Sequence, residues 1–160
     1  MEHQKAIVAL AYKELFGSAF SLLRLVAESY VRGIWLHKCA SEDQIDKFKE
    51  GRVPDFVSLV AAVEKLESHK EGVFSEMRLT SWSLLNDYTH TGYAQLCSRL
   101  TADSIEANYR ADEVLQALNY ADAFGYISAI AICDLTDKVD IANQILQKVK
   151  AEWPVGSQHN

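Results

Sequence analysis

The sequence predicts an all-α protein: a helical bundle of four main helices with short extra helices and a long N-terminal helix. Apolar residues recur every three or four positions along almost the whole chain, and no segment alternates for long as a strand would. Gly and Pro together occupy only nine of the 160 positions, and hydrophobic residues make up 49%, which indicates a folded chain with few turns. The length suits one domain, without a linker or a repeat. We therefore expect a single domain over residues 1–153 and a flexible C-terminal tail over residues 154–160.

The first predicted helix is the longest and runs from about residue 3 to residue 38. Gly17 and Ser18 lie inside it and indicate a kink or a short break. After it, Ser41 and Gln44 fit a capping box, in which each side chain accepts a hydrogen bond from the backbone N–H of the other residue. A second, short helix is therefore expected to start at this point.

The remaining helices are separated by residues that commonly begin or end a helix. Gly51 ends the second helix, Pro54 suits the first turn of the third, and Thr136 caps the last. A polar stretch over residues 101–110 separates the fourth helix from the fifth. The helices expected after the second cover residues 54–68, 73–100, 111–134 and 137–153. Their short connections favour antiparallel neighbours, as in a bundle.

Charge and cysteine content exclude several classes of protein. The net charge is −6 and the isoelectric point is about 5.3, so we expect no broad binding of duplex DNA through its phosphates. Cys39, Cys97 and Cys133 lie in apolar, helix-like surroundings, which indicates buried, reduced thiols in a cytoplasmic protein. The first residues carry charges that a secretory signal would lack, and the longest apolar run, residues 123–133, is too short to cross a bilayer. We expect no membrane partner.

The predicted helix from residue 73 carries two rows of residues at helical spacing instead of one. The first row should face the bundle core and consists of Met77, Ser81, Leu84, Leu85, Tyr88, Gly92 and Leu96. The second row lies on another side and consists of Leu79, Trp82, Asn86, His90, Tyr93 and Cys97. A surface helix normally has one apolar face. The second row therefore needs a further partner, either another helix of this chain or a second subunit.

A polar cluster lies on that second face. Asn86 and His90 are four residues apart and stacked, and Asp87 comes three residues before the histidine. Gly92 either ends the helix, which leaves His90 in the last turn where the helix dipole favours the imidazolium, or permits close backbone contact while the helix continues to Arg99. A histidine at a helix end that is satisfied by Asp87, Asn86 or a carbonyl is the simpler, structural interpretation.

The first predicted helix contains a matching ladder of charges. Arg24, Glu28 and Arg32 recur every four residues among apolar neighbours. Two arginines around one carboxylate neutralise it and could lie half buried, where they would give His90 and Asn86 charged partners. The alternative is a solvated stripe of ion pairs along one helix.

The segment LNDYTH, residues 85–90, resembles the motif of the HEPN superfamily, the higher eukaryote and prokaryote nucleotide-binding domains. Ribonucleases of that superfamily carry Arg-Asn-x-x-x-His on one helix of a helical bundle. Asn86 and His90 match this pattern, whereas the arginine position holds Leu85. The segments RLVAESYVRGIWL and CASEDQIDKFK also resemble a group of uncharacterised bacterial helical proteins. The resemblance implies a homodimer with polar residues near the subunit junction, in a toxin–antitoxin or phage-defence system that acts on RNA.

Two functions follow from these residues. In the first, the protein is HEPN-like and directed to RNA or a nucleotide, as a metal-independent ribonuclease or a degenerate relative. His90 would transfer the proton, and Asn86 would orient His90 or the phosphate. Leu85 can supply no charge, so the cation must come from elsewhere. The arginines considered for that role are Arg24, Arg32, Arg78 and Arg99. In the second, it is a non-catalytic dimeric module that binds a protein partner.

The sequence predicts no metal and no cofactor. Asp87 and His90 have the spacing of a bundle metal site, but such a site needs a second pair and further carboxylates. The seven glycines are scattered, so no phosphate-binding loop is formed. A serine hydrolase lacks its motif and its strand–turn–helix context.

Overall fold

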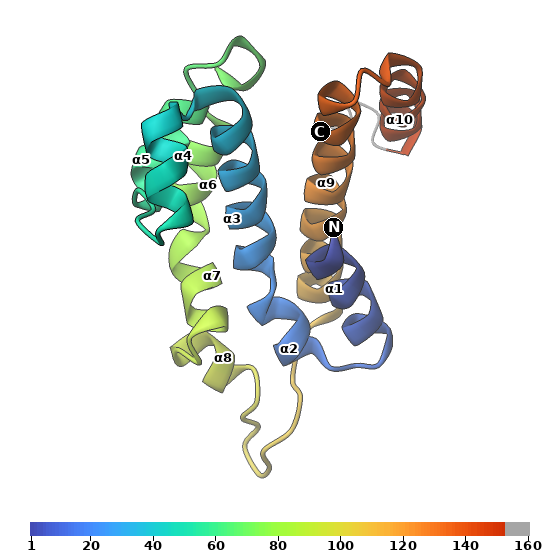
Figure 1. The fold of residues 1–160 in the computed structure, drawn as a ribbon. Helices are drawn as coiled ribbons and strands as arrows, with labels where there is room; N and C mark the ends of the chain where they lie inside the picture. Colours follow the sequence, from blue (N-terminus) through green and yellow to red (C-terminus); the bar gives the residue numbers. More distant parts are fainter. Residues whose placement is uncertain (153–160) are drawn as a thin grey trace.

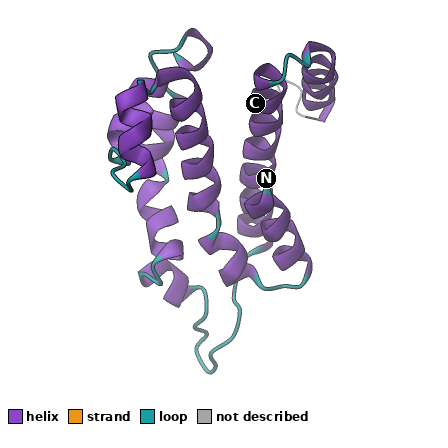
Figure 2. Ribbon diagram, viewed as in Figure 1, coloured by secondary structure: helices purple, strands orange, loops and turns teal. Residues whose placement is uncertain are grey.

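The computed structural model describes residues 1–152. All the secondary-structure elements named within these residues are helices (Figures 1 and 2). The predicted all-α bundle is therefore confirmed. The α-helices are α1 (Glu2–Tyr12), α2 (Phe16–Ser21), α3 (Leu23–Ile34), α4 (Glu42–Lys49), α5 (Phe56–Val63), α6 (Val73–Thr80), α7 (Trp82–Thr89), α8 (Tyr93–Cys97), α9 (Ala111–Leu135) and α10 (Val139–Glu152). A π-helical turn over Trp35–Cys39 extends α3, and a 3₁₀ turn spans Glu67–His69.

The stretch predicted as one N-terminal helix is divided into α1, α2 and α3. The break falls before the expected position, at Glu14, whose φ of 58° is left-handed. The backbone N–H of Leu15 bonds to the carbonyl of Leu10 at 2.9 Å, which closes the turn. Gly17, the expected break, lies inside α2. No glycine stands at the actual turn, so this break left no signal in the sequence.

Helix α3 lies at the centre of the molecule, between a layer formed by α4 to α7 and the pair α1 and α9 (Figure 1). It buries apolar side chains on both sides, such as Val26 and Val31. The most deeply buried large side chains come from α1, α3 and α5: Ile7, Val31, Leu59, Val60 and Val63. This packing fixes the face of α3 that carries the arginines against α7.

The predicted helix starts are confirmed at α4 and wrong at α10. Ser41 and Gln44 form the expected capping box, with both reciprocal hydrogen bonds present. Thr136 does not cap the last helix. It ends α9, because its hydroxyl donates to the carbonyl of Ile132 at 2.9 Å, one turn back. Helix α10 starts three residues later, after Asp137 turns the chain with a φ of 54°.

The stretch predicted as a fourth helix is three helices, α6, α7 and α8. The chain breaks after His90, where Thr91 adopts a left-handed φ of 56° and Gly92 is extended. His90 therefore follows the last residue of α7, and the alternative of a helix that continues to Arg99 is wrong. Both predicted rows are only partly covered. Leu84 of the first row is 50% exposed, and Leu79 of the second row is 76% exposed.

Helix α9 lies along α1 and α3, and α10 folds back against the outer side of α9 (Figure 1). Among the described residues, no helix is both long and apolar enough to cross a membrane. Cys133 is buried and Cys39 is partly buried. Cys97 is exposed, so its predicted burial is wrong. The flexible tail predicted over residues 154–160 lies outside the described residues.

Candidate functional site

The arginine ladder of α3 and the histidine that follows α7 meet in space. Arg24 Nη1 lies 2.7 Å from His90 Nε2. The same guanidinium donates from Nε to Glu28 Oε1 at 2.7 Å and also places Nη2 2.7 Å from that oxygen. Arg32 Nη2 lies 3.2 Å from the other carboxylate oxygen of Glu28. The predicted contact between the ladder and His90 is therefore present.

Glu28 is the buried centre of this cluster. The residue is only 7% exposed, and a carboxylate in such a position must be paired and hydrogen-bonded to be tolerated. Arg24 and Arg32 together provide that pairing and leave a net charge of +1 on the three side chains. The i,i+4 pairs that the alternative of a solvated stripe also expected are present and Arg32 is partly accessible, but the carboxylate at their centre is not solvated.

An aromatic pair fixes the position of the first arginine. Arg24 Cζ lies 5.2 Å from the centre of the Trp82 ring, which is a cation–π contact. Trp82 itself stacks on Phe56 with ring centres 4.2 Å apart and planes within 5°. The guanidinium is thus held between a carboxylate, an imidazole and an aromatic ring, and little of its rotational freedom remains.

Two buried polar atoms on the ladder and on the facing helix carry no hydrogen bond. Asn86 Oδ1 and Arg32 Nε are inaccessible to solvent and have no partner within the described part of the chain. Buried polar groups in folded proteins are nearly always paired. Both atoms therefore retain unused hydrogen-bonding capacity, but a ligand would reach them only if the side chains around them moved.

His90 is the exposed member of the cluster. Its backbone N–H donates to the Asn86 carbonyl at 2.9 Å, which closes the last turn of α7. Since a guanidinium can only donate, the hydrogen bond with Arg24 requires Nε2 to be the acceptor.

Asp87 takes a structural role beside this cluster. Its Oδ2 accepts a hydrogen bond from the backbone N–H of Ala94 at 3.1 Å, which caps α8. Its Oδ1 lies 2.5 Å from the position that a Cβ on Gly92 would take. The carboxylate therefore anchors the turn after His90.

Arg99 lies at another place in the fold. Its Nη2 is 2.5 Å from the position that a Cβ on Gly17 would take, and the Tyr109 hydroxyl is 2.9 Å from the same position. Arg99 therefore packs on the start of α2, whereas Arg24, Glu28 and Arg32 lie along α3. Of these, Arg24 contacts His90 and is linked through Glu28 to Arg32, so the sequence grouped one arginine too many.

The residue at the motif arginine position belongs to the core. Leu85 is 5% exposed and is part of the main apolar cluster. An arginine there would point into the bundle and away from His90. The cation beside the histidine comes instead from α3, 66 positions away in sequence.

A second buried pair was not found from the sequence. The Tyr30 hydroxyl and His69 Nε2 lie 2.9 Å apart. Burial raises the pKa of Tyr30 to about 12 and lowers the pKa of His69, with Glu64 opposing the second effect. Since 39 residues separate the two and neither belongs to a motif, only the folded chain brings them together.

The cluster around His90 suits an anion better than a metal. Within residues 1–152, no three His, Cys, Asp or Glu side chains gather so that they could hold a metal ion. The guanidinium groups of Arg24 and Arg32 and the imidazole of His90 instead provide hydrogen-bonding groups of the kind that recognise a phosphate or the ribose beside it.

A protein-family model described as a family of unknown function, DUF6988, matches residues 1–154. No curated protein and no solved structure matches the chain significantly.

Proposed function

Since the chain belongs to DUF6988, a family of unknown function, we propose its role from its geometry: a metal-independent ribonuclease of HEPN type. The observation that carries the proposal is the contact of 2.7 Å between Arg24 Nη1 and His90 Nε2. It pairs a group that can transfer a proton with a cation that can stabilise a phosphate. Cleavage of RNA without a metal needs both.

Each residue of the cluster has a role in this reaction. When Arg24 turns its N–H groups from His90 to the phosphate, Nε2 becomes free and accepts the proton of the ribose 2′-hydroxyl, whose oxygen then bonds to the neighbouring phosphorus. Arg24 stabilises the charge that gathers on the phosphate oxygens, and the bond to the 5′-oxygen breaks. The leaving 5′-oxygen takes up a proton from water and His90 returns its proton to the solvent, so the products are a 2′,3′-cyclic phosphate and a 5′-hydroxyl. Asn86 lies one turn before His90 on α7, from where it would orient the imidazole or donate from its amide N–H₂ to the phosphate, and Glu28 holds Arg24 in place.

The resemblance to HEPN ribonucleases supports this assignment with one change. Their motif arginine would fall on Leu85, which is buried. Arg24 supplies the equivalent charge from α3, and the cation–π contact with Trp82 orients it. In this proposal the protein acts in the bacterial cytoplasm within a toxin–antitoxin or phage-defence system.

A non-catalytic interaction module is the second candidate. Two observations favour it: the position of the motif arginine is apolar, and α9 and α10 leave much apolar surface uncovered. The two functions differ in one measurable property, because only the first requires His90 to change chemically.

The direct test is cleavage of a fluorescently labelled single-stranded RNA by the purified chain in the presence of EDTA. We expect His90→Ala and Arg24→Ala each to lower the rate by about 100-fold or more, as for the loss of a general acid–base group or of an electrostatic donor. Matched controls are His37→Ala and Arg110→Ala, which remove an exposed histidine and an exposed arginine elsewhere. Circular dichroism verifies that all four variants fold.

Cleavage that is absent from the parent, or unchanged in both site variants, would reject the ribonuclease and favour the interaction module. Induced expression in bacteria gives an independent readout. Growth arrest with RNA degradation that His90→Ala abolishes supports a toxin-like ribonuclease, whereas arrest that His90→Ala does not relieve argues against it.

A further inference from the structure

The contact between Arg24 and His90 occupies the nitrogen on which a general base depends. A neutral imidazole has one nitrogen with a proton and one with a free lone pair, and only the second can take up a proton. The guanidinium donates to Nε2 at 2.7 Å, so this lone pair is already used. His90 is exposed, and solvent therefore reaches the ring while its basic nitrogen is covered.

Arg24 is held by atoms other than the one that covers the histidine. Its Nε and Nη2 each lie 2.7 Å from Oε1 of Glu28, and its Cζ lies 5.2 Å from the centre of the Trp82 ring. Nη1 makes its hydrogen bond to His90 and none to Glu28. The N–H groups of Nη1 can therefore pass from the imidazole to another acceptor while the buried carboxylate keeps the rest of the guanidinium in place.

An oxyanion is a better acceptor for Nη1 than a neutral imidazole. Hydrogen bonds that involve a charged partner are roughly twice as strong as those between neutral groups, and a phosphate adds a full negative charge beside the guanidinium. The two arginines of the ladder and Glu28 together carry a net charge of +1. The side chain of Arg24 is 23% accessible, so an anion can reach it from solvent. A phosphate that binds Arg24 therefore draws Nη1 away from His90.

We propose that Arg24 acts as a gate on His90. In the free protein the guanidinium covers Nε2, and a phosphate oxyanion that binds Arg24 releases this nitrogen. The consequence for catalysis rests on the proposed function, because in a ribonuclease the phosphodiester of the substrate itself releases the base. The site is then inactive toward hydroxyl groups that have no phosphate beside them. The covering of Nε2 is a property of the free chain and can be measured without any cleavage.

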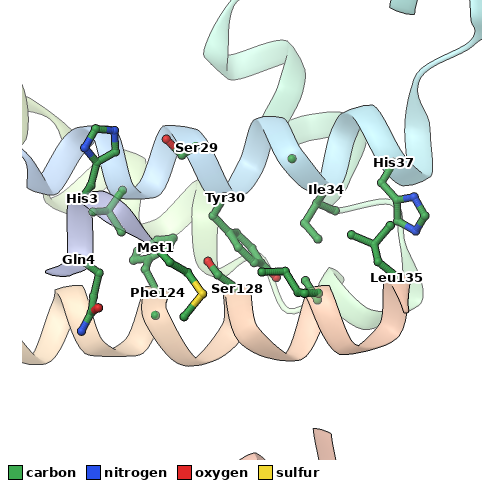
Figure 3. A pocket seen from close by; sticks show the side chains of 15 residues that line it. Met1, His3, Gln4, Ser29, Tyr30, Ile34, His37, Phe124, Ser128 and Leu135 are labelled. Atoms are coloured by element: carbon green, nitrogen blue, oxygen red, sulfur yellow. The ribbon is translucent and has the colours of Figure 1, made fainter. Parts of the chain in front are cut away.

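Two other histidines of the chain serve as references. His37 lies at one end of the cavity between α3 and α9 (Figure 3), and its ring makes no hydrogen bond within the described part of the chain. His69 uses both ring nitrogens, with the Tyr30 hydroxyl at 2.9 Å and the Ser68 hydroxyl at 2.8 Å. A reagent that needs a free ring nitrogen should modify His37 readily and His69 slowly. It should modify His90 slowly in the free protein despite the exposure of the ring.

Modification with diethyl pyrocarbonate above about pH 7, where an ordinary histidine is mostly neutral, tests the gate. The reagent bonds to an unprotonated ring nitrogen and releases ethyl carbonate, and mass spectrometry of the digested chain gives the initial rate at each histidine. The measured quantity is the rate at His90 divided by the rate at His37 in the same sample. Arg24→Ala should raise this ratio by about fivefold or more, as for the loss of one hydrogen bond to the nitrogen. Arg110→Ala, at an exposed ion pair with Asp112, is the matched control and should leave the ratio unchanged.

Phosphate tests the release in the parent protein, so this result does not depend on the folding of a variant. Inorganic phosphate or dimethyl phosphate at up to roughly 50 mM, which exceeds the millimolar dissociation constant of a weak ligand, should raise the ratio in the parent and not in Arg24→Ala. Sodium chloride of equal ionic strength controls for screening. A rise with dimethyl phosphate supports the gate with a phosphodiester as its trigger, and a rise with inorganic phosphate alone supports it with the free anion as its trigger.

Two results would overturn the gate. An unchanged ratio in Arg24→Ala would mean that Nε2 is free from the start, and a parent in which neither phosphate exceeds the salt control would mean that no anion draws Arg24 away. These outcomes are separate from those of the cleavage assay. A parent that cleaves RNA without a phosphate response rejects the gate alone, whereas a phosphate response without cleavage keeps the gate and rejects the ribonuclease.

Discussion

Arg24 of α3 and His90 at the end of α7 meet at 2.7 Å between Nη1 and Nε2. The contact couples two chemical functions, since the imidazole can accept the guanidinium N–H only while it is neutral. It also depends on Glu28, which binds the same guanidinium from the other side. The predictions below separate what this cluster contributes to the chemistry from what it contributes to the fold.

Arg24→Lys should preserve the charge and lose the function. A lysine has one point-like ammonium and cannot bind Glu28, His90 and the Trp82 ring in a fixed plane at once. We expect RNA cleavage to fall by roughly tenfold or more, with the unfolding midpoint in urea lowered only slightly. Arg110→Lys, at an exposed ion pair with Asp112, should leave the rate unchanged. Equal rates for Arg24→Lys and the parent would show that charge alone suffices.

Glu28→Ala should destabilise the fold. Its removal leaves two guanidinium groups without their buried counter-ion, and the loss of one partner of a buried ion pair costs about 3 kcal/mol or more. Urea unfolding measures this change in the free energy of unfolding. Glu67→Ala removes a carboxylate of similar chain length from an exposed pair with Lys70 and should change stability by less than about 1 kcal/mol. Similar losses at both sites would mean that burial of Glu28 has no energetic consequence.

Two glycines should respond to alanine in opposite directions. A Cβ on Gly92 would lie 2.5 Å from Asp87 Oδ1 and 2.9 Å from its Cα, so Gly92→Ala should displace the cap of α8 and cost about 1–3 kcal/mol. Gly33 lies inside α3, where a Cβ would meet no atom of the described chain within 4 Å beyond its own helix. Gly33→Ala should therefore stabilise the protein by about 1 kcal/mol. Thermal unfolding of the two variants compares them, and a stabilising Gly92→Ala would contradict the crowded turn.

Stability should fall in mild acid because of His69. Burial holds its pKa in the folded protein below the ordinary value of 6.5. Above that value the ring is neutral in both states and has no effect. As the pH falls below 6.5, the unfolded chain binds the proton first, so the free energy of unfolding decreases until the folded form is protonated as well. Urea unfolding between pH 7.5 and pH 5 measures the decrease.

His69→Phe keeps a ring beside Phe74 and removes the titrating group. The decrease below pH 6.5 should be smaller in this variant, whereas His37→Ala, at an exposed position, should leave it as in the parent. An identical decrease in His69→Phe and the parent would assign the acid sensitivity to other groups.

The sequence predicted the fold class and the central contact because both follow from helical periodicity. Arg24 and His90 each lie on a partly apolar stripe that had to face another helix, so their meeting was predictable. The break at Glu14 was not, because it is a non-glycine residue with left-handed backbone. The break after His90 was one of the two alternatives that Gly92 left open, although Thr91, and not Gly92, takes the left-handed conformation. Arg99, which follows this second break, lies at Gly17 and not at the ladder.

Leu85→Arg should unfold the protein and not restore a HEPN motif. Leu85 is buried among apolar side chains, and a guanidinium there would lack both water and a carboxylate, which costs several kcal/mol. Leu84→Arg is the matched control, because its neighbour in sequence is half exposed and an arginine there can reach solvent. We expect limited proteolysis and circular dichroism to show a disrupted Leu85→Arg chain and a folded Leu84→Arg chain. If Leu85→Arg instead folded and cleaved RNA faster than the parent, the motif position would accept its arginine after all, and Arg24 would no longer be needed as the cation beside His90.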